Sequence, residues 1–210
     1  MGTGQRRRSD RGRGRRLLLS LSVVGAAAAI AGLGTYASFT STTQATQTVA
    51  SGTVVIALGA PGPANRLNVG ASGLVAGDTV QRVADLANTG SQNLSSVTLS
   101  TVATASSALD TDATNGLQMV IDACSVAWTE GGTAPAYTYT CTGTTSLVVA
   151  ATPVIGTGLA LSNLGSLTAG VTDHLRITLT LPATAGTTLQ GQSSTIQYTF
   201  TGTQRAATSQ

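Results

Sequence analysis

The stretch His174–Pro182 has the sequence HLRITLTLP. Leucine and isoleucine alternate in it with arginine and threonine, so one side of an extended chain would be apolar and the other polar. The segment Thr195–Thr201, TIQYTFT, repeats the alternation with isoleucine, tyrosine and phenylalanine on one face. We predict two strands here, paired with each other across residues 183–193.

Further short apolar segments, separated by clusters of Gly, Asn, Asp and Pro, also predict strands. They are residues 53–58, 79–87, 94–103, 117–128, 136–141, 146–150 and 158–161. No stretch of the body keeps a 3.6-residue apolar period, so we expect helix to be limited to a turn or two. Strands with one apolar face are buried most simply in two packed sheets. We therefore predict an all-β fold, a jelly-roll-like antiparallel β-sandwich over residues 53–204, with a C-terminal tail at 205–210.

The composition agrees with this class and restricts the partners. The 210 residues include 36 threonines, 25 glycines and 3% aromatic residues, which favours pleated sheet over helix. All 11 basic residues are arginines, and seven of them precede residue 17. The remainder of the chain has four arginines against seven acids, a net charge of −3 that repels phosphate. We expect no nucleic-acid partner.

The arginine-rich start continues into an apolar run at residues 17–33, LLLSLSVVGAAAAIAGL. A basic segment, an apolar helix and small residues form an export signal, in which Thr35 and Ala37 suit a signal peptidase. We predict an N-terminal signal helix within residues 1–37, cleaved between Ala37 and Ser38, and a secreted mature chain. Signal peptidase would be a transient partner, and membrane contact would occur only through this segment before cleavage. A retained anchor is the alternative.

The mature chain would begin with residues 38–52, SFTSTTQATQTVASG, which are polar and uncharged. Phe39 and Val49 are the large apolar residues of this segment. It cannot fold by itself, so it stays flexible or borrows a hydrophobic groove from its own sandwich or from a neighbour.

Cys124 and Cys141 lie in the exported part, where oxidation is permitted, so we predict a disulfide between them. It would pin residues 125–140 as a hairpin and contribute about 3 kcal/mol by loop-closure entropy. Trp128 and two tyrosines flank this bridge. They could form an exposed patch for carbohydrate or a partner, or they could pack against the disulfide.

Several stretches are similar to the TasA and camelysin family of bacterial matrix-fibre proteins. The residues that carry the resemblance are Gly34, Thr35, Tyr36, Ala37 and Phe39 at the junction, Ala50-Ser51-Gly52-Thr53 before the first strand, Ala76-Gly77-Asp78-Thr79 and Asn88-Thr89-Gly90 around the second, and Gln190-Gly191-Gln192, Tyr198, Phe200 and Gln204 at the end. Ala76 departs from the family's pattern, which has proline there.

The resemblance implies a secreted subunit of an extracellular fibre or biofilm matrix, located in the matrix or at the cell surface. Copies would self-assemble into a non-covalent homopolymer when the N-terminal strand of one completes the sheet of the next. Phe39, Val49, Val54 and Ile56 would belong to this assembly strand. Such head-to-tail contacts do not close and therefore propagate. The alternative is a monomeric cell-envelope binding module that uses the hairpin from Trp128 to Tyr139.

Members of this family are also described as metallopeptidases, so catalysis needs a test. Zinc hydrolysis requires two or three His or carboxylate ligands and a general base. The chain has one histidine, His174, and one glutamate, Glu130, far apart in sequence. No G-x-S-x-G motif is present. We predict that the protein is not an enzyme, with no catalytic, cofactor-binding or metal-binding residues, and keep a secreted peptidase as the weaker alternative.

Asp110 and Asp112 have the first half of a calcium-loop spacing, but the closing glutamate is missing, so a turn is favoured over a calcium site. The absence of lysine excludes Lys-Asn isopeptide cross-links. Any polymer would be non-covalent or disulfide-linked.

Overall fold

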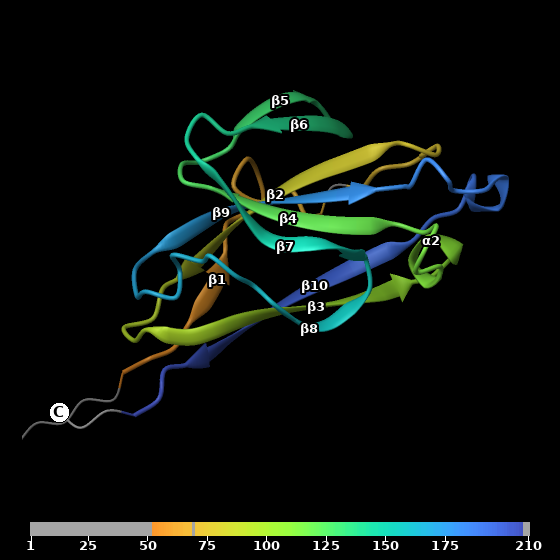
Figure 1. Ribbon diagram of the computed structural model, residues 1–210. Helices are drawn as coiled ribbons and strands as arrows, with labels where there is room; N and C mark the ends of the chain where they lie inside the picture. The colour runs from red at the N-terminus through yellow and green to blue at the C-terminus, as the bar shows by residue number, and fades with distance from the viewer. Residues whose placement is uncertain (1–51, 69, 208–210) are drawn as a thin grey trace, which may run out of the picture. The chain divides into compact units, whose positions relative to one another are not determined.

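Strands make up much of the part of the chain that this computed structural model describes, residues 52–68 and 70–207 (Figure 1). They are β1 (Ile56–Leu58), β2 (Thr79–Asn88), β3 (Leu94–Ala105), β4 (Gln118–Cys124), β5 (Thr129–Thr133), β6 (Ala136–Thr140), β7 (Thr145–Pro153), β8 (Gly156–Ala160), β9 (Thr172–Thr180) and β10 (Thr195–Gln204). Helix in these residues is limited to α2 (Ala108–Thr111) and a 3₁₀ turn at Thr187–Leu189. The all-β prediction is confirmed.

The strands form two antiparallel sheets and a separate hairpin. Sheet A has the order β1-β2-β9-β4-β7, sheet B has the order β10-β3-β8, and β5 pairs with β6 (Figure 1). Strand β9 lies at the centre of sheet A, between β2 and β4. Its alternating sequence directs leucine and isoleucine to one face, which packs against sheet B.

The core lies between the two sheets. Its buried side chains are Ala84, Leu86, Met119, Ile121, Ala123, Val148, Val149, Leu175 and Ile177 from sheet A, Leu94, Val97 and Leu99 from sheet B, and Leu161 and Leu164 from a loop. A second cluster lies near α2 and consists of Leu109, Leu117, Val154, Leu181 and Leu189. Together they confirm the predicted sandwich.

The predicted pairing of the two C-terminal strands is wrong. Strand β9 pairs with β2 and β4 in sheet A, whereas β10 pairs with β3 in sheet B. Residues 181–194 carry the chain from one sheet to the other, and Leu181 and Leu189 are anchored in the second core cluster. An alternating pattern specifies which face of a strand is buried but not which strand lies beside it.

The predicted strand at residues 117–128 is also wrong in its second half. Strand β4 ends at Cys124, and the chain then turns into the β5–β6 hairpin. The Gly131-Gly132 pair in β5 hid this strand, because glycine weakens strand propensity. The predicted hairpin at residues 125–140 is confirmed.

The first strand is shorter than the predicted 53–58, since β1 begins at Ile56. Val54 and Ile56 both pack against the chain's own core. The predicted signal segment, the Ala37–Ser38 cleavage point, Phe39 and Val49 lie outside the described residues. Within the described part, no helix has the length and apolar character needed to cross a membrane.

Candidate functional site

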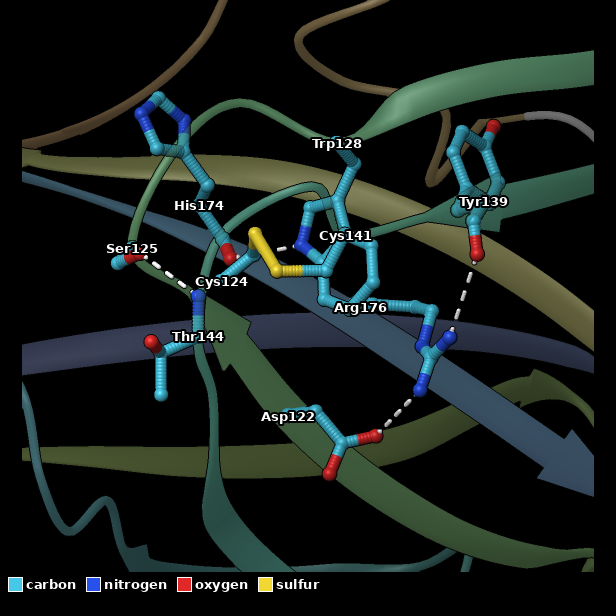
Figure 2. The surroundings of a disulfide bond; sticks show 9 residues. All are labelled: Asp122, Cys124, Ser125, Trp128, Tyr139, Cys141, Thr144, His174 and Arg176. Carbon is cyan, nitrogen blue, oxygen red and sulfur yellow. Dashed lines mark hydrogen bonds and ion pairs between the residues drawn. A yellow bond between two sulfur atoms is a disulfide. The ribbon is translucent and has the colours of Figure 1, made fainter.

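A disulfide ties the β5–β6 hairpin to sheet A. Cys124 ends β4, Cys141 follows β6, and their sulfur atoms are bonded with the Cα atoms 5.8 Å apart (Figure 2). The bond confirms the predicted pairing. It makes the hairpin return to the strand from which it departed, so the hairpin lies on the outer face of sheet A.

The tryptophan of the hairpin points toward sheet A. The Trp128 indole N–H donates a hydrogen bond of 2.8 Å to the His174 carbonyl, and His174 is the register partner of Cys124 (Figure 2). The Arg176 guanidinium lies 4.4 Å from the centre of the Trp128 ring. A cation over an aromatic face is attracted by the ring quadrupole. Trp128 therefore helps to dock the hairpin beside the disulfide.

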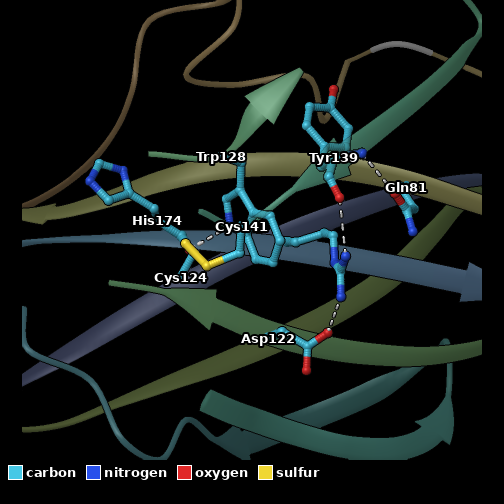
Figure 3. A network of polar contacts seen from close by, with 8 residues as sticks. Gln81, Asp122, Cys124, Trp128, Tyr139, Cys141 and His174 are labelled. Atoms are coloured by element: carbon cyan, nitrogen blue, oxygen red, sulfur yellow. Dashed lines mark hydrogen bonds and ion pairs between the residues drawn. A yellow bond between two sulfur atoms is a disulfide. The ribbon is translucent and has the colours of Figure 1, made fainter. Parts of the chain in front are cut away.

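Tyr139 of β6 makes the closest polar contacts between the hairpin and the sheet. Its backbone N–H donates to the Gln81 side chain at 3.0 Å, and its carbonyl accepts from Arg176, which also pairs with Asp122 at 2.9 Å (Figure 3). Its hydroxyl donates to Glu130 at 3.1 Å. Burial, reinforced by the hydrogen bond to Glu130, raises the pKa of Tyr139 to about 12.

Arg66 fixes the other side of the hairpin. Its guanidinium binds both carboxylate oxygens of Glu130, at 2.7 and 2.8 Å, and lies 4.8 Å from the centre of the Tyr137 ring. The hydrogen bond from Arg66 is the main reason that the pKa of Glu130 is lowered. Bidentate pairs of this kind add geometric specificity. The aromatic and charged side chains of the hairpin are thus used to cover sheet A.

Sheet B, in contrast, has an incompletely covered edge. Strand β10 pairs with β3 on one side and is the outermost strand of its sheet. Its inward-facing residues Ile196, Tyr198 and Phe200 are half-buried, whereas Leu99 and Thr101 of the adjacent β3 are 0% exposed. The apolar face of β10 therefore lacks the cover that a neighbouring strand would supply.

The seam between β10 and the facing edge of sheet A is closed at one end only. At that end β1 fills it, because Ile56 occupies the space next to Gly202 of β10. Beyond Leu58 the chain leaves the sheet, and β1 covers only the last three residues of β2. Toward the start of β2 and β10 the seam opens into a pocket of about 310 Å³.

The pocket is mainly apolar with a polar margin. Side chains from three parts of the fold line it: Val80 and Arg82 of β2, Leu179 of β9, Ile196 and Tyr198 of β10, and Leu109 and Leu117 near α2. Burial raises the pKa of Tyr198 to about 12. Burial also lowers the pKa of Arg82, against the opposing effect of nearby tyrosines.

The comparison with known families agrees with this sandwich of exported type. Residues 16–209 match the family described as camelysin metallo-endopeptidase. The chain belongs to this family. The resemblance predicted from residues 34–58, 76–90 and 190–204 is thereby confirmed. No curated protein matches the chain.

The description of the camelysin family implies a catalytic metal ion, but the donor set of this chain does not fit one. His174, the single histidine, has its Nδ1 atom 2.7 Å from Asp85. Glu130, the single glutamate, is held by Arg66 and Tyr139. Across residues 52–68 and 70–207, no three His, Cys, Asp or Glu side chains are grouped so that they could hold a metal. No hydrolytic step is derived from these residues.

Asp110 and Asp112 serve as caps of α2. Asp110 accepts hydrogen bonds from the Ser107 N–H and the Ser106 and Ser194 hydroxyls. Burial opposes its ionisation, but these bonds outweigh it and lower the pKa of Asp110. Asp112 accepts from the N–H groups of residues 114 and 115. This is the local role that the sequence favours over calcium.

Sequence reasoning missed the residues that hold the hairpin on sheet A. Arg176 and Asp122 occupy polar positions of two alternating strands, which identifies them as outward-facing but does not pair them. They are direct register partners across β4 and β9. Knowledge of that strand pairing would have found them, since opposite charges on neighbouring strands attract.

Proposed function

We propose that the protein is an exported structural subunit that assembles into an extracellular fibre or biofilm matrix. Residues 38–51 of one copy would extend the sandwich of another copy as an added strand. The observation that carries this proposal is the uncovered edge of β10, ten residues long with a half-buried apolar face. Because Val54 and Ile56 belong to the chain's own core, the donated segment ends before them.

Physical chemistry supports strand addition at such an edge. An outermost strand presents N–H and C=O groups that an extended segment can pair with, and side chains on alternate positions supply specificity. Residues 38–51 have the composition required, with many threonines and no charge. A segment donated from one copy to the next forms a heterologous contact, which continues as a filament.

The same proposal assigns no catalytic, cofactor-binding or metal-binding residue to the chain. It rests on the side chains available: His174 is engaged by Asp85, and Glu130 is engaged by Arg66. Incubating the purified protein with unfolded casein, with and without added Zn²⁺, tests this part. We expect no cleavage, and metal-dependent cleavage by protein free of contaminating protease would contradict it.

The monomeric alternative, a binding module built on the Trp128–Tyr139 hairpin, has weaker support. Tyr139 is 5% exposed, and the N–H group and one face of Trp128 are already used for docking. Glycan-binding sites generally need an accessible aromatic face. The rings of this hairpin are turned toward sheet A instead.

Truncation of the donated segment tests the proposed function. Protein that begins at Ser38 is compared with protein that begins at Thr53, by size-exclusion chromatography and negative-stain electron microscopy. We expect filaments from the first and monomers from the second. Circular dichroism is the control, because the shorter chain keeps every strand and both core clusters. Equal monomers, or filaments from both chains, would contradict strand donation.

A further inference from the structure

We propose that the pocket in the open seam between β2 and β10 is the acceptor for Phe39 of a second copy. This inference rests on the proposed strand donation and adds where the strand binds, which side chain anchors it and how successive copies are oriented. The observations are the position of the pocket, the position at which the described chain begins, and the alternation of side chains in the segment that precedes it.

The start of the described chain and the pocket lie at opposite ends of the sandwich. The Thr53 N–H donates to Ser91, in the turn between β2 and β3, at 3.0 Å. Arg205, just after β10, binds the Gln92 side chain in the same turn at 3.2 Å. The pocket is lined by the first residues of β2 and β10. Strand β10 has ten residues, so the two ends are separated by about 30 Å at roughly 3.3 Å per residue.

The direction of β1 favours donation to another copy. Strand β1 is antiparallel to β2, so it runs from the β2–β3 turn into the body of the sandwich. A chain that continues β1 backwards therefore leads away from the molecule at that end. It would have to reverse direction to reach its own pocket, whereas the pocket end of a second copy placed end to end lies directly ahead. Successive copies would then have the same polarity.

The segment itself has a side-chain pattern that fits this seam. In an extended chain, positions 39, 45 and 49 share one face and are Phe, Ala and Val. The opposite face, positions 38 to 48 at even numbers, has only hydroxyl and amide side chains. A strand beside β10 would turn the first face to the core and the second to water. Phe39 is the large apolar side chain that could occupy the apolar pocket.

A charge placed at the mouth of the pocket tests the location. In protein that begins at Ser38, we expect Ile196→Glu to abolish filaments, because Ile196 lines the pocket. The matched control is Gln197→Glu, the next residue of β10, whose side chain is exposed on the opposite face. We expect the control to form filaments like the parent protein. Filaments from Ile196→Glu would overturn the assignment.

Mixing two defective proteins gives a positive result that misfolding cannot imitate. The Ile196→Glu protein keeps its N-terminal segment, and the protein that begins at Thr53 keeps its pocket. We expect neither to polymerise alone and the mixture to form a 1:1 complex. If the truncated protein forms monomers but the mixture stays unassociated, the acceptor location is wrong while strand donation stands. If the truncated protein polymerises, the proposed function itself is wrong.

A synthetic peptide of residues 38–51 tests the anchor without altering the folded protein. It is titrated into protein that begins at Thr53, beside a peptide with Phe39→Ala. Burying a phenylalanine side chain contributes enough that we expect the altered peptide to bind at least about tenfold more weakly. Amide hydrogen exchange should show protection at β10. Equal binding of the two peptides, or protection confined to other strands, would overturn the inference.

Discussion

At the scale of single residues, Asp110 shows how one carboxylate fixes the end of the sandwich beside the pocket. It accepts hydrogen bonds from Ser106 and Ser107 at the start of α2 and from Ser194 just before β10. The short helix, which could not persist alone, is thereby joined to the edge strand. The position of β10 at the pocket end therefore depends on a charged cap.

We expect Asp110→Asn to lower the free energy of unfolding by about 1–2 kcal/mol at pH 7, because an amide cannot accept all three bonds. The pKa of Asp110 is lowered in the folded state from its ordinary value of 3.8. Its contribution is thus fully present above that value and is lost as the pH falls through the lowered pKa. Urea unfolding at pH 7 and pH 2.5 measures the difference between variant and parent.

The matched control for this substitution is Asp78→Asn, because Asp78 accepts the single N–H of Val75 and an amide oxygen can replace it. We expect the control to change stability much less at pH 7. If the Asp110→Asn difference were the same at both pH values, the ionised carboxylate would not be the source of the stabilisation.

At the scale of elements, the β5–β6 hairpin and the edge strand β10 contrast. The hairpin is held to sheet A by the Cys124–Cys141 disulfide, the Arg66–Glu130 pair and the Trp128 contacts. Strand β10 is held by β3 alone and leaves its apolar face half-covered. One element is a finished cover, and the other is an edge open to addition.

Replacing both cysteines with serine should destabilise the fold by about 3 kcal/mol, because the disulfide restricts the unfolded chain. The remaining polar contacts of Tyr139 and Glu130 keep the hairpin folded, but it opens more often. Hydrogen exchange should therefore accelerate first at residues 129–140. Equal acceleration in the central strand β9 would mean that the hairpin is not a separate unit.

Two large-to-small substitutions compare the buried and the open face of sheet B. Leu99→Ala in β3 removes a side chain that is 0% exposed, and we expect a loss of about 2–5 kcal/mol. Phe200→Ala, at its register partner in β10, should cost less in protein that begins at Thr53, although phenylalanine is larger. Urea denaturation measures both. A greater cost for Phe200→Ala would mean that the seam is already fully packed in the monomer.

At the scale of the whole molecule, any fibre is expected to be held by strand pairing and apolar contacts. The chain has no lysine for an isopeptide bond, and its two cysteines are bonded to each other. Successive subunits therefore share no covalent link. The polymer depends on the hydrogen bonds and side-chain burial that a donated strand supplies.

Fibres from protein that begins at Ser38 should persist in dithiothreitol under native conditions. They should dissociate to a single monomer band in hot SDS without reductant, because detergent removes apolar contacts and leaves covalent bonds intact. Gel electrophoresis with and without reductant makes the comparison. A ladder of bands in SDS would show covalent linkage and contradict strand pairing as the sole connection.

Much of the candidate site could not be predicted from local patterns. The disulfide could, since two cysteines in an exported chain have one possible partner each. The contacts of Arg176 with Asp122 and Trp128, and of Arg66 with Glu130, could not, because the residues are 37 to 64 positions apart or more than 40 in most pairs and leave no joint signature. Each depends on which strands become neighbours.

The sequence by itself determined the class of fold, the positions of most strands and the face that each one buries. The physical reason is local: a period of two residues places apolar side chains on one side of any extended chain. Only the tertiary structure decided that β9 and β10 belong to different sheets, that the hairpin covers sheet A, and that the seam beside β10 stays open. Those outcomes depend on how distant strands share one limited core, and no short stretch of sequence encodes that competition.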